Sequence, residues 1–513
     1  MRELVLALVA GLLVATGGPP FPVAGVVTAF AGVVIFAALV QGARARRGAL
    51  LGLLFGTGTN LVAMSFVPTT ITTFTELPTV VAVLALVLLA LGQSLPWVVT
   101  GALAPLFSRW IAFPLAFAAA LGLGAYVPAI FPWTIAAPLA RVPVLLQAAD
   151  VIGERGVAMV LAGLAALAVA PAPRRRSLVV AGAVFASLLG YGLVSRARID
   201  RLRAAAPSPL VALVQQAVPP KERWKPENAP AIAQKLRALT RVAERQGATL
   251  AIWPEAAWPV TMPHQPQRDD ALGYHVRQGF TIPVIMGLLT DAHPPDGAVG
   301  RWYHNATALV QRDGSIPQPS AKMALLAFGE SVPLGDLFPG LRRAFARAGG
   351  LVPGEEVVLL NVDGEPRIRA GVLNCYEDTL PAMGRKTALA GPNVLVNVTN
   401  DAWFGTTAEP ELHLLEAIPR AIETRRDLLR AVNTGVTAHV DATGRVVARA
   451  EREIATSLLV RPALLDLPPT LYARFGDAIA WGILALLATA TFFLARTSMR
   501  RPVDALADAP PKD

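Results

Sequence analysis

The chain has 513 residues, of which 54% are hydrophobic and only 16% are charged, and it contains one cysteine. Soluble globular proteins carry about a quarter charged residues, so this depletion predicts several membrane spans joined to a folded domain. The composition excludes a disordered chain, a collagen, a coiled coil and a disulfide scaffold.

The net charge of +10 does not indicate nucleic-acid binding, because of where the charge lies. Residues 1–203 hold 14 arginines and five acidic residues, so nine of the ten net charges belong to the hydrophobic part. These arginines stand in short clusters between apolar runs, which is typical of membrane-flanking charge and not of a stripe along a phosphate backbone. We therefore expect no nucleic acid among the partners.

Eight apolar runs are typical of transmembrane helices, since a bilayer core takes roughly 20 apolar residues per helix. They lie near residues 3–18, 24–42, 49–67, 78–106, 110–127, 156–171, 178–194 and 477–495. The first run also fits a signal peptide, but it lacks a clear small-residue cleavage site. We expect a transmembrane region over 1–204, a C-terminal transmembrane helix with a basic flank over 467–501, and a disordered tail over 502–513.

The arginine clusters predict the orientation, because cytoplasmic loops keep Lys and Arg. Clusters at 44–47, 109, 174–176 and 496–501 alternate correctly if both termini are cytoplasmic. The long segment between the seventh and eighth runs then lies on the outer face. The cluster Arg196, Arg198, Arg201 and Arg203 disagrees, and we interpret it as contacts to anionic lipid head groups.

Residues 205–466 have ordinary charge density and alternate strand-like and helix-like patterns, which predicts a layered α/β domain. The strand-like runs lie at 210–217, 248–253, 281–289, 305–311, 368–374, 393–399 and 435–441. The helix-like runs lie at 228–246 and 411–431.

The lone cysteine, Cys375, stands in GVLNCYED just after a run of apolar β-formers. This places it at the C-terminal end of a buried strand, where open α/β sheets have their ligand crevices. An unpaired cysteine in a translocated domain is exposed to oxidation, so a chain that keeps one has a use for the thiol. The alternative is a small buried hydrophobic residue.

Two further residues fit acid–base chemistry. Glu255 follows the strand-like run ATLAIW in WPEAAWP, where desolvation raises a carboxylate pKa toward that of a general base. Lys322, in PSAKMALLAFGE, precedes an apolar loop. A Glu and a Lys together can deprotonate a thiol and stabilise an oxyanion without histidine. Each alone also fits an ordinary edge-of-sheet carboxylate or a solvated lysine.

Histidine chemistry has less support. None of the six histidines has HExxH spacing, and one cysteine cannot form a thiolate zinc cluster, so we expect no metal and no cofactor. His413 or His439 paired with Cys375 would form a papain-like dyad, and the alternative is that both are structural. The sequence has no GxSxG elbow and no P-loop.

Four motifs in this order resemble the nitrilase superfamily, with its Glu–Lys–Cys triad: WPEAAWP, the stretch from Lys322 to AFGESVP, NCYED and LVNVTNDAWFG. With the eight surrounding runs, the chain resembles the bacterial apolipoprotein N-acyltransferase family. LVQQAVPPKERW, FPW and AIETRRDLLRAVNTGVTAHVDATGRV are also similar to that family, so the resemblance covers essentially the whole chain.

The resemblance implies a nitrilase-like α-β-β-α sandwich on a membrane helix bundle, with Glu255 as general base, Lys322 as electrostatic stabiliser and Cys375 as nucleophile. The supporting positions that carry over are Glu330, Tyr376, Glu377 and Trp224. It also implies the reaction. Cysteine takes an acyl group from a phospholipid such as phosphatidylethanolamine, and the thioester acylates the α-amine of a diacylglyceryl-cysteine apolipoprotein. We expect a monomer in the bacterial inner membrane, in contact with membrane lipid, with its site on the periplasmic face.

Some positions depart from the family pattern. Residues 323–327 are Met-Ala-Leu-Leu-Ala where a His-Leu-Val-Pro-like stretch is usual, Ser320-Ala321 replaces a polar pair, and Asp427 stands where proline is common. These departures bear on the shape of the Lys322 loop, and hence on substrate preference or rate more than on the reaction class. The segment 331–354 mixes apolar residues with arginines and fits an interfacial lid or an ordinary surface helix.

Two other functions remain open at this level. A membrane-tethered amidase or hydrolase of the nitrilase superfamily would pass the same acyl group to water. A catalytically silent binding protein would be indicated by loss of the triad, but Glu255, Lys322 and Cys375 are all present.

Overall fold

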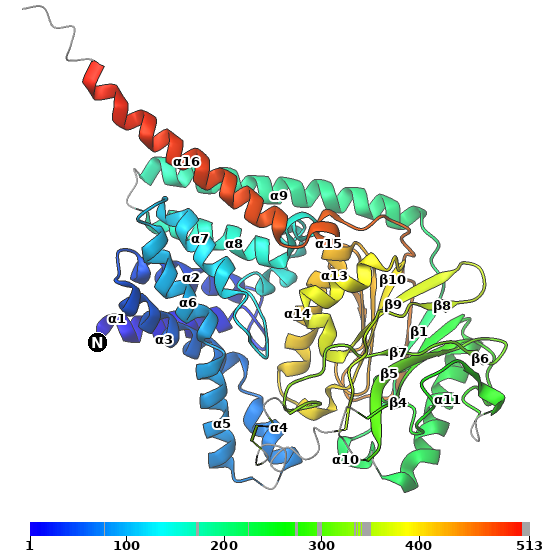
Figure 1. The fold of residues 1–513 in the computed structure, drawn as a ribbon. Coiled ribbons are helices and arrows are strands. Elements are labelled where there is room, and N and C mark those ends of the chain that lie inside the picture. Colours follow the sequence, from blue (N-terminus) through cyan, green and yellow to red (C-terminus); the bar gives the residue numbers. More distant parts are fainter. Residues whose placement is uncertain are drawn as a thin grey trace, which may run out of the picture.

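The computed structural model describes residues 1–75, 77–170, 174–223, 225–271, 275–294, 300–332 and 350–504, together with 335, 337, 338 and 340. A helical region, formed mainly by the first two hundred residues, lies beside an α/β domain (Figure 1). Helix α9 runs along both, whereas α16 starts near their junction and runs over the helical region.

The helices of the N-terminal region follow the predicted apolar runs. They are α1 (Arg2–Ala15), α2 (Gly25–Val40), α3 (Ala45–Ala63), α4 (Val67–Phe74), α5 (Thr79–Gly92), α6 (Leu95–Phe107), α7 (Phe113–Gly124), α8 (Ala149–Val169) and α9 (Arg174–Ala205). The predicted run 78–106 is divided into α5 and α6 at Gln93 and Ser94. The eighth run forms α16 (Ala478–Asp504), which packs on α7 and α8.

Small residues let these helices pack backbone to backbone, as is typical of membrane helix interfaces. A Cβ atom at Gly48 on α3 would lie 2.0 Å from the carbonyl oxygen of Gly101 on α6, and one at Gly101 would lie 2.1 Å from the carbonyl oxygen of Gly48. Any larger side chain at either position would force the two helices apart.

Eight membrane spans are more than length and hydropathy support. In the described part of the chain, three helical segments are long and apolar enough to cross a bilayer: Thr79–Phe107, Ala149–Val169 and Arg174–Ala205. A fourth is added if the pair Ala45–Ala63 and Val67–Thr73, bent by 50°, counts as one span. The apolar helices Gly25–Val40, Phe113–Gly124 and Ala478–Leu494 are shorter. The structure therefore has three or four helices of membrane length.

The α/β domain contains two six-stranded mixed sheets. The first has the order β14-β1-β2-β4-β5-β7 and the second the order β13-β12-β11-β10-β9-β8. The strands of the first are β1 (Val211–Gln215), β2 (Leu250–Ile252), β4 (Val284–Ala292), β5 (Trp302–Val310), β7 (Ser320–Ala321) and β14 (Thr456–Val460). Those of the second are β8 (Leu360–Val362), β9 (Ile368–Asn374), β10 (Val394–Thr399), β11 (Leu428–Val432), β12 (Ala438–Val440) and β13 (Val446–Arg449). A short pair, β3 (Gln267–Arg268) with β6 (Ser315–Ile316), stands apart.

The two sheets pack face to face and helices cover their outer faces, which confirms the predicted sandwich (Figure 1). Val211, Ile252, Val372 and Val396 belong to one buried cluster between the sheets. Helix α11 (Ala229–Arg245) packs on the first sheet, and α13 (Pro381–Leu389) and α14 (Glu409–Thr424) pack on the second. Because α14 also contacts α8, it joins the sandwich to the helical region.

One predicted helix was too long. The run 411–431 reads as a single helix, but α14 ends at Thr424 and β11 begins at Leu428. Arg425 ends the helix in a left-handed conformation with φ of 55°, which turns the chain into a strand parallel to β10. The strand was missed because its Leu-Leu-Arg-Ala sequence continues the apolar helical period, and only the pairing with β10 selects the extended form.

The proposed lipid contact of Arg203 is also wrong. Its side chain is at the end of α9, where Nη2 lies 2.9 Å from Asp427 Oδ2 and Nη1 lies 3.4 Å from Asp441 Oδ2. Asp427 also accepts a hydrogen bond from His439 at 2.8 Å. Although burial opposes it, these bonds from His439 and Arg203 lower the pKa of Asp427 to about 2. The aspartate that replaces the usual proline is therefore the centre of a buried ion-pair cluster.

Candidate active site

The triad residues follow three strands from both sheets and meet in one place. Glu255 follows β2 and Lys322 follows β7 in the first sheet, and Cys375 follows β9 in the second. Gly287 on β4 makes room for the first of them, because a Cβ there would lie 2.5 Å from the Cα of Glu255. The pairing of β5 with β7 places Lys322 beside Asn305, whose carbonyl oxygen accepts the Lys322 N–H at 2.8 Å.

Lys322 lies between two buried carboxylates. Its Nζ is 2.7 Å from Glu330 Oε2 and 3.3 Å from Glu255 Oε1. The amide nitrogen of Asn305 donates to both acids, at 2.7 Å to Glu255 and 2.8 Å to Glu330. One cation and one amide therefore hold two carboxylates, and the shorter ion pair is with Glu330.

Because Glu255 and Glu330 share Lys322 unequally, their pKa values shift in opposite directions. Burial raises the pKa of Glu255, and Lys322 only partly offsets this. Burial also disfavours the charge of Glu330, but Lys322 and the N–H of Leu326 outweigh burial and lower its pKa. Although desolvation opposes it, the two acids hold the pKa of Lys322 well above its usual range. A charged Lys322–Glu330 pair thus lies beside a carboxyl group, Glu255, with raised proton affinity, as expected for a general base.

Cys375 is placed at a sharp turn where the chain leaves β9. Its φ is 51°, a left-handed conformation that is uncommon for a residue with a Cβ atom. Burial and the charge of Glu255 raise the pKa of the thiol well above its usual range, although Lys322 opposes them. The thiol is hydrogen-bonded to Glu255, and the residue remains partly exposed. The thiol is therefore protonated at rest, and the carboxyl group of Glu255 lies beside it.

Glu377 connects the cysteine turn to the lysine loop. Its Oε1 accepts the backbone N–H groups of Met323 at 2.6 Å and Ala324 at 2.9 Å, and its Oε2 accepts the N–H of Asn374 at 2.8 Å. Because these bonds use the backbone of residues 323 and 324, they tolerate the unusual side chains there. Burial raises the pKa of Glu377.

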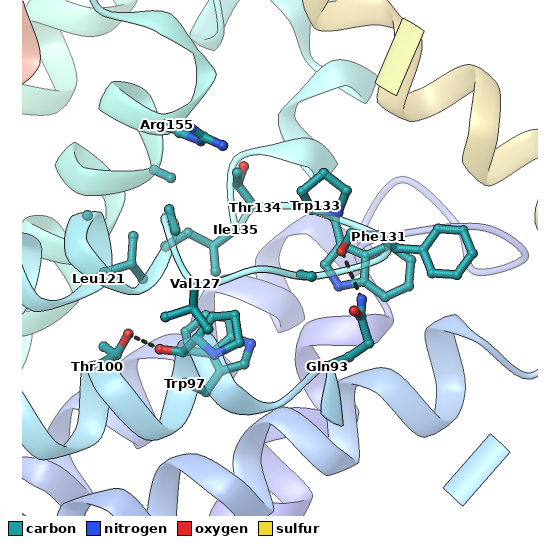
Figure 2. A pocket seen from close by; sticks show the side chains of 16 residues that line it. Gln93, Trp97, Thr100, Leu121, Val127, Phe131, Trp133, Thr134, Ile135 and Arg155 are labelled. Atoms are coloured by element: carbon teal, nitrogen blue, oxygen red, sulfur yellow. Dashed lines mark hydrogen bonds between the residues drawn. The ribbon is translucent and has the colours of Figure 1, made fainter. Parts of the chain in front are cut away.

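Tyr376, next to the cysteine, contacts the helical region. Its hydroxyl donates to the carbonyl oxygen of Ile130, in the loop between α7 and α8. Gln93, at the break between α5 and α6, holds the same loop. It accepts the Ile130 N–H at 2.6 Å. It also donates to the Phe131 carbonyl at 3.0 Å (Figure 2). A mostly apolar pocket of about 60 Å³ adjoins Gln93 and this loop (Figure 2). The helical region thus reaches the residue beside Cys375.

Aromatic side chains connect the start of α4, the loop between α7 and α8, and the turn after β10. The ring of Phe66, at the start of α4, lies 6.0 Å from Phe131 and 5.2 Å from Phe404 between ring centroids. Phe131 stacks on Trp133 at 6.0 Å. This cluster gives the junction between the helical region and the sandwich an apolar surface near the site.

The histidine alternatives are not supported by the geometry. Both ring nitrogens of His413 contact aspartates, Asp378 at 2.9 Å and Asp401 at 3.0 Å, and His439 contacts Asp427. Asp401, Glu409 and His413 place potential ligand atoms within 4.8 Å of one another. Because both nitrogens of His413 are already engaged, this group fits an ion-pair network better than a metal site.

Sequence reasoning missed Asn305 and Gln93. A signal existed for Asn305, because an amide in the apolar strand run NATALVQ is costly to bury unless it is hydrogen-bonded. Gln93 gave no comparable signal, since its partners are backbone groups of a distant loop. Trp224 and residues 341–349 of the predicted lid lie outside the described residues. Leu337 and Phe338, which are described, are 72% and 58% exposed.

Two family models match separate parts of the chain. The model described as carbon-nitrogen hydrolase matches residues 210–462, and the apolipoprotein N-acyltransferase N-terminal domain matches residues 10–167. Among solved structures, an amidase of the nitrilase superfamily from Nesterenkonia AN1 is similar at 19% identity and a TM-score of 0.36, covering 53% of this chain and 94% of that one.

Two curated relatives match nearly end to end. An apolipoprotein N-acyltransferase from Methylococcus capsulatus is 31% identical over 501 residues, covering 94% of this chain and 95% of the relative. One from Geobacter metallireducens is 28% identical over 505 residues, covering 94% of both chains. With both domains matched in order, the chain belongs to the apolipoprotein N-acyltransferase family, as the sequence motifs predict.

Proposed function

We propose that this chain transfers an acyl group from a phospholipid to the α-amino group of a diacylglyceryl-cysteine apolipoprotein, with Cys375 as the acyl carrier. The observation that carries the proposal is the bond between the hydroxyl of Tyr376 and the carbonyl of Ile130. It ties the residue beside the thiol to a loop between membrane-type helices. A site built at that junction suits two lipid-anchored substrates, whereas a soluble amide needs no such placement.

In the first half-reaction, Cys375 gives its proton to Glu255 while the sulfur attacks the ester carbonyl of the phospholipid. Lys322 stabilises the oxyanion of the tetrahedral intermediate. When the intermediate collapses, the C–O ester bond breaks and Glu255 returns the proton to the leaving glycerol oxygen. The products are a lysophospholipid and a thioester on Cys375. The raised pKa of both Glu255 and Cys375 supports a proton transfer coupled to attack, in preference to a preformed thiolate.

In the second half-reaction, the free amine of the apolipoprotein attacks the thioester. Glu255 takes one proton from the amine and gives it to the departing sulfur of Cys375, so the enzyme returns to its starting state. The products are an N-acylated lipoprotein and the free thiol. Asn305, Glu330 and Glu377 hold the reacting groups in place through the bonds described above.

The membrane arrangement is part of the same proposal. All eight apolar runs cross or enter the membrane, the shorter helices lying in the bundle formed by the three or four of full length. Residues 205–466 form the catalytic domain on the periplasmic face of the bacterial inner membrane, between the transmembrane regions 1–204 and 467–501. Phosphatidylethanolamine is the expected donor. The placement of the domain at the membrane is supported by the distribution of the arginines and by the aromatic cluster at the junction beside the site.

Intact mass spectrometry tests the proposal directly. The detergent-purified protein is incubated with phosphatidylethanolamine beside the variant Cys375→Ala, and a diacylglyceryl-cysteine peptide is then added. We expect an acyl adduct that hydroxylamine removes, that the alanine variant lacks, and that moves to the amine of the peptide. An adduct that decays to free fatty acid without acylating the peptide would indicate the membrane-tethered hydrolase instead. No adduct at all would contradict both.

A further inference from the structure

A buried ionic ring contacts the cysteine turn through the carbonyl oxygen of Cys375. Its members come from five different elements and are all at least nine-tenths buried. They are Asp378 on the 3-10 turn after β9, Asn397 on β10, Asp401 on the turn after β10, His413 on α14 and Arg430 on β11. The reaction described above uses none of them.

The ring reaches Cys375 through one amide. The Nδ2 of Asn397 donates to the carbonyl oxygen of Cys375 at 3.1 Å and to that of Leu373 at 2.8 Å. Its Oδ1 accepts from Arg430 Nη1 at 3.1 Å. Since Asn397 is fully buried and all its bonds run to fixed groups, its amide cannot rotate without breaking them.

Arg430 and His413 close the ring around two aspartates. Arg430 pairs with Asp378 through Nη1 and lies 3.3 Å from Asp401 through Nη2. His413 bridges the same aspartates from the other side, at 2.9 Å and 3.0 Å. Each aspartate therefore has one arginine and one histidine partner. Removing the histidine would leave both aspartates half-paired in a buried site.

The electrostatics agree with a charged histidine. Burial and Arg430 disfavour the imidazolium, but Asp378 and Asp401 outweigh them and raise the pKa of His413 to about 10. Two carboxylates are then balanced by two cations. The neighbouring acids on α14 do not upset this balance at neutral pH: burial raises the pKa of Glu416 to about 8 and that of Glu409 well above its usual range.

The ring also bears on the conformation and charge of the cysteine. A left-handed cysteine persists only where surrounding structure fixes it, and the bond from Asn397 to its carbonyl is one such constraint. The charge of Asp401 raises the pKa of the Cys375 thiol. A loss of positive charge from the ring would therefore both loosen the turn and disfavour the thiolate.

We propose that His413 is a positioning residue for the nucleophile, acting through Asp378, Asp401, Arg430 and Asn397 to hold the Cys375 turn in its left-handed form. The inference rests on the proposed role of Cys375 as acyl carrier. It assigns to His413 neither a contact with substrate nor the transfer of a proton.

The test compares His413→Gln with His439→Gln. His439 is the matched control, because it is an equally buried histidine paired with an aspartate, Asp427, in a different cluster. Since Cys375 is the only cysteine, its alkylation by iodoacetamide can be followed by mass without ambiguity. Thioester formation from phosphatidylethanolamine is measured in a single turnover, over a series of donor concentrations.

We expect His413→Gln to slow the maximal rate of thioester formation about tenfold or more with an unchanged half-saturating donor concentration. The pH midpoint of alkylation should rise, because the thiolate loses a nearby compensating cation. His439→Gln should leave both quantities unchanged, whatever it does to the unfolding temperature. Wild-type values in His413→Gln, or equal losses in both variants, would overturn the proposal.

A second variant protects the test against misfolding. Asn397→Val places a β-branched side chain of similar size on β10 and removes the amide that bonds Arg430 and the carbonyl oxygens of Leu373 and Cys375. It should reproduce the slow thioester formation, and a wild-type rate would overturn the proposal. Alkylation requires no lipid donor. Thus, if the wild-type protein forms no thioester, the proposed function fails while the alkylation comparison still tests the positioning role.

Discussion

Two buried ionic clusters, one at the candidate active site and one between the sandwich and the helical region, differ in the cation they contain. At the site, Lys322 is shared unequally between Glu330 at 2.7 Å and Glu255 at 3.3 Å. Two acids compete for one ammonium group, so one of them keeps a raised pKa. This cluster contains a group ready to accept a proton.

The junction cluster is built on arginines from α14 and its end. Arg420 lies 2.8 Å from Glu154 on α8, and Arg425 lies 2.7 Å from Asp150 on the same helix. Arg425 also donates to Gln147 Oε1 at 2.6 Å and to Ser195 Oγ on α9 at 2.8 Å. A single guanidinium group thus ties α14 to two helices of the membrane region.

The difference follows from the two cations. A guanidinium stays charged and has five donors in a fixed plane, so it suits a permanent anchor with many partners. An ammonium is a compact charge that can be shared between acids whose proton affinities then separate. We therefore expect the first cluster to take part in proton transfer and the second to hold the two regions together, and mutations in each cluster test that division.

The largest expected effect is at the shared carboxylate. Glu255→Gln should slow thioester formation by about 10³-fold, since an amide cannot take the thiol proton. The unfolding temperature should change little, because glutamine can keep the hydrogen bond from Asn305 and removes a buried charge that Lys322 only partly offsets. Single-turnover mass spectrometry and a thermal melt measure the two quantities. If Glu255→Gln forms the thioester at the wild-type rate, Glu255 is not the general base.

Lys322→Arg should slow thioester formation by about 10²-fold although the charge is kept. The planar guanidinium cannot take the place of a buried ammonium group between two acids and also face an oxyanion. Lys225→Arg is the control, because Lys225 is in an exposed pair with Glu222 and should show no change. Equal rates for wild type and Lys322→Arg would mean that only the charge matters at this position.

At the junction between the sandwich and the helical region, Arg425→Lys should lower the stability of the protein and leave the rate of thioester formation unchanged. The guanidinium group of Arg425 bonds Asp150, Gln147 and Ser195, and the ammonium group of lysine can replace only some of these bonds. We therefore expect a loss of about 3 kcal/mol in the free energy of unfolding. Protease susceptibility and the thermal midpoint in detergent report it. Arg201→Lys on exposed helix surface is the control. An unchanged thermal midpoint would show that the guanidinium group of Arg425 does not stabilise the contact of α14 with α8 and α9.

Stability should fall as the pH rises from about 4.5 to about 8. Burial raises the pKa of Glu416 to about 8, above its value in an unfolded chain. The stability contributed by the neutral acid is therefore complete below about pH 4.5 and is lost as the pH rises through 8, with a slope of up to about 1.4 kcal/mol per pH unit. Glu416→Gln should flatten the dependence of the melting temperature on pH between about pH 5 and 8, whereas exposed Glu227→Gln should not. Parallel curves for both variants would refute the assignment.

The smallest expected effect is in the loop beside the site. Gln93→Leu removes both bonds that hold Ile130 and Phe131, so Tyr376 loses a fixed partner. Thioester formation should slow about fivefold, because Tyr376 acts on the cysteine turn only by position. The variant Thr72→Val, on exposed surface of α4, serves as the control. If both variants react at the wild-type rate, the contact with the helical region does not affect the rate of thioester formation.

The comparison also explains which residues sequence reasoning found. Glu255, Lys322 and Cys375 stand in dense local motifs, and each follows a recognisable strand, so their meeting could be predicted. Asn305, Asn397 and Gln93 are single amides whose roles depend on partners 22 to 69 residues away in the chain. A local pattern does not specify such partners, because the hydrogen bonds form only after the strands and loops have paired.

The helical region shows the same limit. The sequence located the apolar runs, but the run 78–106 divides into α5 and α6 at Gln93, whose side chain binds the loop between α7 and α8. The end of α14 at Thr424 depends on the left-handed Arg425 and its partners on α8 and α9. Both changes occur where a polar side chain gains buried partners that a helix-forming sequence does not reveal.

The amino-acid sequence by itself determined the two-part organisation, the family and the three residues of the candidate triad, because hydropathy and dense motifs are local properties. Tertiary structure decided how Lys322 is divided between two acids, how Glu377 holds its loop, and how α14 is anchored to the membrane region. These features depend on distances between segments far apart in the chain. Such distances are set only when the two sheets and the helical region have packed.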